Sequence, residues 1–330
     1  MVTIFDSLNE HGIHVMDSFE FEYGRVLNDV EVEYSTFGIP KYDEDGYITN
    51  AVLFSSTFRG IYSFLTGMHG YILENGNLDD EFYFIMINSL GTPDSCSPSS
   101  TGLNDDFPKY TVKDQVNFRR QFLFEKFKIK KILGLVGEGI GAFQFLTWAC
   151  EYPDEMRFLI IVNSAANVSG YRFILSKTFE SIIDAADNCN DDYGVSKNNA
   201  VVAINALLFA HSSSKLAFNK LDNDEITIIF EDFADECFFR DIYDFKFRND
   251  CDMDFDVINK LQDIEAKSLF IGTNANYFYS EYDMIPFKEL VKDSEVLIES
   301  TDQSDYHFKQ GDYKSVGDKI ISFLNQFLSE

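Results

Sequence analysis

The sequence has no uninterrupted stretch of about 18 apolar residues, the length that a membrane-spanning helix needs. Residues 1–6 lack the basic and apolar regions of a signal peptide. Cysteine is scarce: the five residues are an odd number and lack the paired spacing of a zinc site or of a secreted disulfide framework. We therefore expect a cytoplasmic protein with free thiols, no metal, no cofactor and no association with a membrane.

Basic residues are also few. The chain has 27 Lys and Arg against 55 Asp and Glu, a formal net charge of −28. Such a balance repels phosphate backbones, and no basic stripe offsets it, so we expect no nucleic-acid partner. The acids are dispersed along the chain, which favours a solvated surface over an acidic docking site.

Hydrophobic residues are abundant at 45%, enough for the core of one large domain in 330 residues. Short apolar runs typical of strands buried on both faces occur at 51–54, 82–87, 131–136, 158–162 and 267–272, with a shorter one at 296–298. Alternation predicts a hairpin with arms at 19–23 and 30–37. Helical patterns cover 116–127 and 316–327. Strands that alternate with helices predict an α/β protein with a mostly parallel central sheet flanked by helices.

The pattern changes between residues 168 and 265. Helical patterns at 173–186 and 199–210 dominate this stretch, and it has a single strand-like run at 226–230. Residues 231–255 are either a partly disordered linker or a packed segment, and their aromatic content favours packing. We expect a core formed by residues 1–167 and 266–330 and a helical cap (lid) formed by residues 168–265.

The pentad Gly137-Glu138-Gly139-Ile140-Gly141 joins the run at 131–136 to a helical pattern at 142–149. Strand, sharp turn and helix in this order match the nucleophile elbow G-x-S-x-G, with glycine at the serine position. Gly139 tolerates the strained backbone of such a turn but carries no hydroxyl. The pentad alone is a weak signal, because short glycine patterns recur by chance.

Further segments support the elbow. They are NAVL at 50–53, NSLG at 88–91, SSTG at 99–102, FPKYTVKDQV at 107–116 and WACEYP at 148–153. With these segments the chain resembles the homoserine O-acetyltransferase family of α/β-hydrolase-fold enzymes over most of its length, with an altered cap. The resemblance implies an α/β-hydrolase fold. It also implies a ping-pong reaction in which a serine takes an acyl group from coenzyme A and passes it to the homoserine hydroxyl.

The resemblance assigns the site position by position. Gly139 stands at the nucleophile, Asn276 at the triad acid and His307 at the base, while the backbone amides of Phe58 and Ile140 stand at the oxyanion hole. Asparagine can accept a hydrogen bond from imidazole but cannot stabilise imidazolium with a charge. Loss of one triad member costs several orders of magnitude in rate, so two altered positions imply close to negligible turnover.

Other groups are weaker candidates for a nucleophile. In the elbow geometry Glu138 is expected to point away from the pocket, and Cys96 and Cys150 are expected to be structural. Ser55 and Ser56 lie near the expected pocket, but at the oxyanion loop, where they are poorly placed as nucleophiles. Asp302 and Asp305 lie near His307 in sequence and are alternative orienting acids, or ordinary loop residues. The other histidines are expected to be structural or solvent-facing: His11 and His14 in a terminal segment, His69 after a helix and His211 at the end of one.

Three functions remain open. The first is a catalytically degenerate relative whose pocket binds a small molecule, such as an acyl-coenzyme A, or a protein partner. The second is a divergent acyltransferase or hydrolase that uses His307 with an activated water or a displaced nucleophile. The third is a structural subunit that pairs with an active acyltransferase. We favour the first and expect a homodimer through the cap.

Overall fold

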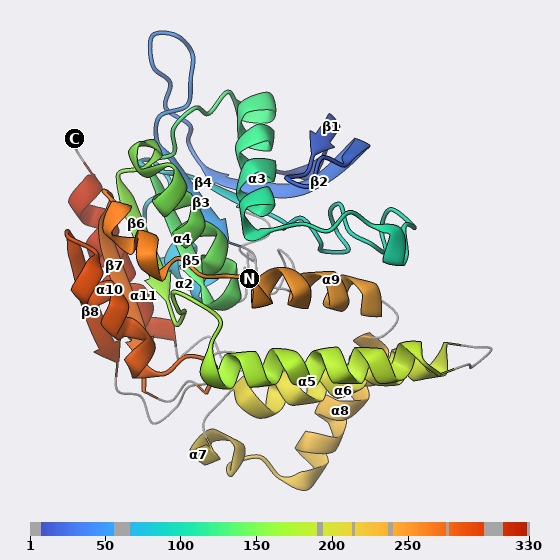
Figure 1. Ribbon diagram of the computed structural model, residues 1–330. Coiled ribbons are helices and arrows are strands. Elements are labelled where there is room, and N and C mark those ends of the chain that lie inside the picture. Colours follow the sequence, from blue (N-terminus) through green and yellow to red (C-terminus); the bar gives the residue numbers. More distant parts are fainter. Residues whose placement is uncertain are drawn as a thin grey trace.

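The computed structural model describes residues 8–55, 67–189, 194–212, 215–236, 240–274, 277–299 and 313–328. In this part of the chain eight strands form one sheet in the order β1-β2-β4-β3-β5-β6-β7-β8 (Figure 1). The pairs β1/β2 and β2/β4 are antiparallel, and every other pair is parallel. The mostly parallel sheet expected from the sequence is confirmed.

The five central strands are short and buried on both faces, as their continuous apolar runs indicate. The strands are β1 (Glu10–Glu20), β2 (Val26–Gly38), β3 (Ala51–Ser55), β4 (Tyr83–Ile87), β5 (Gly134–Glu138), β6 (Phe158–Val162), β7 (Lys267–Thr273) and β8 (Ser294–Glu299).

Helices cover both faces of the sheet (Figure 1). On one face α2 (Met68–Asn75) and α11 (Lys314–Leu324) pack on the sheet through one apolar cluster. On the other face α3 (Val112–Phe127) and α4 (Ala142–Glu151) belong to a larger cluster, which α10 (Ile285–Leu290) also joins. Helix α3 begins with a capping box in which Thr111 and Asp114 satisfy each other's backbone amides.

In the part of the chain that the structure describes, five α-helices lie between β6 and β7, in the segment expected to form the cap. They are α5 (Gly170–Asp187), α6 (Val195–Ser212), α7 (Lys215–Phe218), α8 (Asn223–Glu236) and α9 (Ile242–Met253). Residues of α5, α6 and α9 share a separate small apolar cluster. In Figure 1, α5, α6 and α8 lie together on one side of the sheet, and α9 lies between them and α3. The division into core and cap at residues 168 and 265 stays a prediction.

The structure corrects three local expectations. The first hairpin strand is not 19–23: it starts at Glu10, so His11 and His14 lie in β1, and residues 21–25 form the turn. The run 226–230 is not a strand but part of α8, whose acidic first turn favours a helix start. His69 does not follow a helix; it lies in α2, is almost fully buried, and burial lowers its pKa to about 3. Most of 231–255 is helical and packed, as its aromatic residues indicated.

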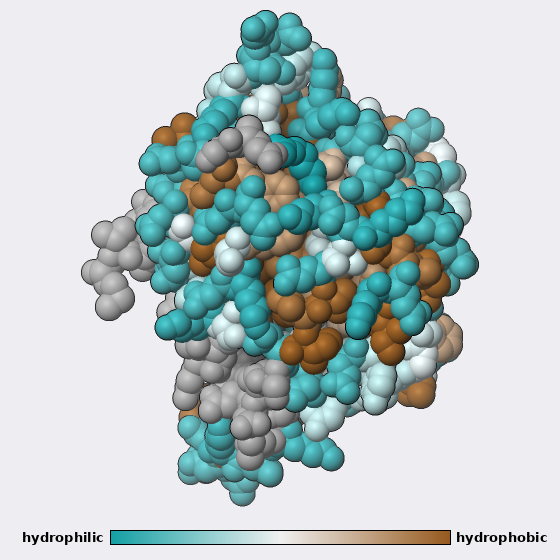
Figure 2. All heavy atoms as spheres, turned by 90° about the vertical axis from the view of Figure 1, so that its left-hand side faces the viewer, coloured by the Kyte–Doolittle hydropathy of each residue, from teal (hydrophilic) through white to brown (hydrophobic). Residues whose placement is uncertain are grey.

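None of the helices described combines the length and hydrophobicity that crossing a lipid bilayer requires. Figure 2 shows the face formed by the β8 end of the sheet, where hydrophilic residues surround a hydrophobic area near the centre. The four described cysteines, Cys96, Cys150, Cys189 and Cys251, are free. Among the described residues, no group of three or more His, Cys, Asp or Glu side chains is arranged to hold a metal ion.

Candidate functional site

The pentad of the sequence forms a strand-turn-helix elbow. Strand β5 ends at Glu138, a 3₁₀ turn covers Gly139–Gly141, and α4 starts at Ala142. Gly139 has φ of +57°, in the left-handed region that a side chain makes costly. A Cβ added to Gly137 would lie 2.9 Å from the Ala142 Cα, so the strand and the helix approach too closely for a side chain there. The backbone of a nucleophile elbow is present.

Described atoms do not crowd the space at Gly139. A Cβ added there would lie 3.7 Å from Cε2 and 3.9 Å from the hydroxyl oxygen of Tyr279, and 4.0 Å from the backbone oxygen of Asn163. These are ordinary van der Waals distances. The Gly139 carbonyl accepts a hydrogen bond from the Ser164 hydroxyl at 2.8 Å. The described residues therefore leave room for a Cβ at position 139, where glycine carries no hydroxyl.

Asn163 fixes the edge of the sheet beside the elbow. It follows β6, is 2% exposed and has φ of +43°, a conformation that asparagine tolerates better than most residues. Its side-chain oxygen accepts hydrogen bonds from the amide and the hydroxyl of Thr273, the last residue of β7, at 2.9 and 3.0 Å. The ends of β6 and β7 are thus held together where the loop toward Asn276 begins.

The remaining assigned positions are only partly described. Ile140 follows Gly139 in the turn and is half-buried, at the position expected for one oxyanion donor. Phe58, Asn276 and His307, like Ser56, Asp302 and Asp305, lie outside the described residues. Their roles stay predictions.

An aromatic and cationic group, not anticipated from the sequence, borders the elbow. Tyr279 is 4% exposed, and the Arg172 guanidinium lies 4.4 Å from the centre of its ring. The same guanidinium lies 5.4 Å from the ring of Phe143, which stacks on Phe255 at 4.0 Å.

Arg172 comes from the first turn of α5. Burial raises the pKa of the Asp252 carboxyl, and the charges of Arg248 and Arg172 oppose that shift. A positive charge therefore lies against the Tyr279 ring, which borders the elbow.

The alternative nucleophiles are poorly suited to attack. Burial raises the pKa of Glu138 to about 8, so its carboxyl group is mostly protonated at neutral pH. Burial also raises the pKa of the Cys96 and Cys150 thiols to about 12, which keeps them from forming thiolate. Ser55 is fully buried at the end of β3, and its hydroxyl accepts a hydrogen bond from the Glu138 amide at 3.3 Å.

A Ser-His-Glu arrangement, separate from the elbow, lies in the β1/β2 hairpin. His11 Nδ1 is 2.7 Å from the Ser35 hydroxyl, and His11 Nε2 is 3.5 Å from a Glu33 carboxylate oxygen. Ser35 has no exposed surface, and burial raises the pKa of Glu33 to about 7. A substrate cannot reach a hydroxyl that is enclosed by the sheet, so this array joins neighbouring strands and is not a catalytic site.

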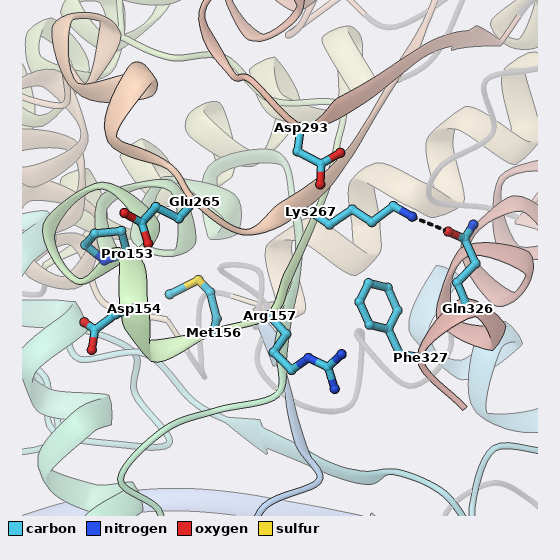
Figure 3. A pocket seen from close by; sticks show the side chains of 9 residues that line it. All are labelled: Pro153, Asp154, Met156, Arg157, Glu265, Lys267, Asp293, Gln326 and Phe327. Carbon is cyan, nitrogen blue, oxygen red and sulfur yellow. Dashed lines mark hydrogen bonds between the residues drawn. The ribbon is translucent and has the colours of Figure 1, made fainter. Parts of the chain in front are cut away.

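An open cavity of about 500 Å³ lies at the opposite edge of the sheet. Figure 3 shows its lining from the starts of β6 and β7 and the end of the chain, with Lys267 donating a hydrogen bond to Gln326 at 2.7 Å. The elbow lies at the carboxyl ends of the parallel strands, where ligands of open α/β sheets bind, and this cavity lies at their amino ends. It is not part of the elbow site. Its lining residues are Pro153, Asp154, Met156, Arg157, Glu265, Lys267, Asp293, Gln326 and Phe327.

Comparisons with known proteins agree with this architecture. The crystal structure of esterase E22 has a TM-score of 0.80 at 18% identity, covering 96% of this chain and 99% of the esterase. A homoserine O-acetyltransferase of Methanohalobium evestigatum is 28% identical over 169 residues, which are 46% of this chain and 33% of that enzyme. A scan against models of known protein families gives no match.

One relative matches almost from end to end. A protein named a probable acyltransferase, from Methanothermobacter thermautotrophicus, is 35% identical over 310 residues, which are 94% of this chain and 96% of that protein. The sheet order, the elbow and the structural likeness identify the fold as the α/β-hydrolase fold. The chain therefore belongs to the family of this probable acyltransferase, within the α/β-hydrolase-fold proteins related to homoserine O-acetyltransferases and esterases.

Proposed function

We propose that this protein is a catalytically degenerate member of its acyltransferase family, and that its elbow pocket binds a small molecule without forming an acyl-enzyme. The observation that carries the proposal is Gly139, with φ of +57°, at the turn where a serine nucleophile would stand. Covalent transfer by this elbow requires a nucleophilic side chain at this position, and glycine offers none.

The reaction rate expected without a nucleophile favours binding over turnover. Removing the nucleophile of a catalytic triad leaves a rate only about 10³ to 10⁴ above that in water, supplied by the oxyanion hole and by substrate binding. The described groups next to the elbow are poor replacements for the lost oxygen. The Glu138 carboxyl is mostly protonated at neutral pH, Ser55 is enclosed, and burial raises the pKa of the Tyr279 hydroxyl. The Arg172 guanidinium over the Tyr279 ring supports binding of an anionic ligand, such as an acyl-coenzyme A, without reaction.

A second function has one observation in its favour. A Cβ added at Gly139 would meet no described atom closer than 3.7 Å, which favours space for a water molecule where a serine side chain would lie. A weak hydrolase would use this water with His307 as the base. Activity that disappears in His307→Ala would favour this second function.

The test is acetyl transfer from acetyl-coenzyme A to homoserine, followed as release of free thiol. Native protein, Gly139→Ser, the double variant Gly139→Ser/Asn276→Asp and His307→Ala are compared. We expect the native protein to be silent and the double variant to gain activity. Gly102→Ser is the matched control, because Gly102 has φ of +68° with no atom within 4 Å of an added Cβ and lies far from the elbow in sequence.

Binding is measured separately as the shift in melting temperature with acetyl-coenzyme A. A saturable rise in the native protein, without thiol release, is the expected result. If the native protein turns over and His307→Ala abolishes this activity, the protein is not catalytically degenerate. If the native protein shows no turnover and no binding of acetyl-coenzyme A, the proposed ligand is wrong.

A further inference from the structure

Another open cavity lies on the face of the sheet that α3 and α4 cover. Its volume is about 400 Å³, within the roughly 300 to 1,000 Å³ typical of pockets for small molecules. α3 and α4 pack against each other here (Figure 1), and the loop from α3 to β5 also contributes to the lining. Trp148, which lines the cavity, lies about 9 Å along α4 from Ala142, where the elbow ends. The cavity is therefore separate from the elbow.

Half of the cavity lining is apolar. Leu123, Ile129, Ile132 and Trp148 belong to the main apolar cluster and are at most 4% exposed, so the cavity reaches the surface of the core. Phe124, near the end of α3, also lines the cavity but is 53% exposed. A ligand with an apolar chain would remove the Phe124 ring and part of this core surface from water, which favours binding.

Most polar groups of the lining are already paired within the protein. Arg120 donates from Nε and Nη2 to the two carboxylate oxygens of Glu155, at 2.9 and 2.5 Å. The Trp148 ring nitrogen also donates to Glu155, at 2.8 Å. Gln121 donates to Glu125 at 2.9 Å. The charges of Arg120 and Glu155 therefore balance each other, and a ligand would gain little from either.

Lys130 is the exception. It is exposed, lies in the loop between α3 and β5, and its Nζ is 3.6 Å from the centre of the Tyr47 ring. Among the described residues, it is the one charged group of the lining without a carboxylate partner. Two neighbouring lysines are paired, Lys126 with Glu10 and Lys131 with Asp154.

The sequence around Lys130 is unusually basic for this chain. Residues 126–131 read KFKIKK, in a protein with a formal net charge of −28. An anion approaches such a protein against its overall field unless positive charge is concentrated locally. This segment supplies that concentration beside an apolar cavity.

We propose that this cavity binds a small amphiphilic monocarboxylate, with its apolar chain in the cavity and its carboxylate beside Lys130. A ligand with several negative charges, such as an acyl-coenzyme A, does not suit a lining that offers one unpaired cation. The site is distinct from the elbow and does not rest on the proposed function.

The first test uses the native protein and its single tryptophan, Trp148. Bromine on the end of an alkyl chain quenches tryptophan emission at contact, so 8-bromooctanoate should quench Trp148 in a saturable manner. Hexanoate, octanoate and decanoate should then relieve the quenching in competition, with an affinity that rises about fourfold for each added methylene. Absence of quenching, or an affinity independent of chain length, would overturn the proposal.

The second test separates the charge from the apolar chain. Lys130→Met should weaken octanoate about twofold to fivefold, because the ion pair is exposed, and should leave the neutral analogue octanol unchanged. Lys131→Met is the matched control, because Lys131 pairs with Asp154 and does not line the cavity, and it should change neither ligand. Equal losses of octanoate in the two variants would show a general charge effect and overturn the role of Lys130.

A third variant tests the location of the chain. Phe124→Ser changes an exposed ring and is expected to fold, which its melting temperature checks. It should weaken octanoate and octanol alike, by about fivefold, because both chains lose the same apolar contact. Unchanged affinity for both ligands would place the chain elsewhere and overturn the site.

Discussion

Replacing Glu138 with glutamine at the elbow should make the protein more stable at alkaline pH. The carboxyl group precedes Gly139, lies at the end of β5 and has no cation beside it in the described part of the chain. Burial is the cause that raises its pKa from 4.5 to about 8. Glutamine has nearly the same shape and no charge, so the variant removes the ionisation and keeps the packing.

The direction of the pH effect on the free energy of unfolding depends on whether the folded or the unfolded state binds the Glu138 proton more tightly. The folded protein holds the Glu138 proton up to about pH 8, and the unfolded chain releases it near pH 4.5. The contribution of Glu138 to the free energy of unfolding is therefore present below pH 4.5 and is lost as the pH rises through 8. About 3.5 pH units at about 1.36 kcal/mol each set an upper bound near 5 kcal/mol. Partial exposure of the side chain reduces the expected effect to about 2 to 3 kcal/mol.

The assay is denaturant unfolding of native protein and Glu138→Gln at half-unit steps from pH 4.5 to 9. The two proteins should be about equally stable at pH 4.5, and the variant should lead by about 2 to 3 kcal/mol at pH 9. Glu44→Gln, in an exposed turn, is the control and should follow the native profile. If the stabilities of native protein and Glu138→Gln change with pH in parallel, the Glu138 carboxyl is not held protonated in the folded protein. Such a result would also reopen Glu138 as a base or nucleophile.

Two further changes test the elbow and its surroundings. Arg172→Met should lower the affinity for acetyl-coenzyme A about tenfold in a titration, because a charge-assisted contact is lost. Lys177→Met on the same helix, where Lys177 pairs with Glu180, should leave the affinity unchanged. Equal losses in the two variants would point to a general charge effect. Gly137→Ala should lower the free energy of unfolding by about 1 to 3 kcal/mol in denaturant unfolding, since its Cβ would lie 2.9 Å from the Ala142 Cα. A change near zero would mean that the turn is less tightly packed than described.

The sequence predicted the centre of the sheet well because a strand buried on both faces needs only a continuous apolar run. β3, β6 and β7 agree with their expected runs to within a residue. The β1 edge strand was missed because it is half-exposed: Ile13 and Val15 are 60% and 49% exposed. Such a strand mixes polar and apolar residues without a clear period. In α8, the β-branched run at 226–230 indicated a strand, but neighbours of strong helix propensity and tertiary packing prevailed.

The elbow was predictable for a similar reason, since its glycines are local requirements of one tight turn. The group that borders it was not. Arg172 and Tyr279 are 107 positions apart, and they meet because the first turn of α5 and the loop after β7 both reach the carboxyl edge of the sheet. No local spacing signals this contact, because the topology alone brings the two residues together.

The energetics of the elbow bear on the proposed function. Gly139 avoids the strain that a side chain would have at φ of +57°, a difference of about 1 to 2 kcal/mol, and it offers no hydroxyl for covalent transfer. Beside the turn, Asn163 bonds the end of β7, and the Arg172 guanidinium lies over the Tyr279 ring. Holding a positive charge against a buried ring is a costly arrangement for a scaffold and a useful one for a binding site, which supports the proposal that the elbow binds a ligand.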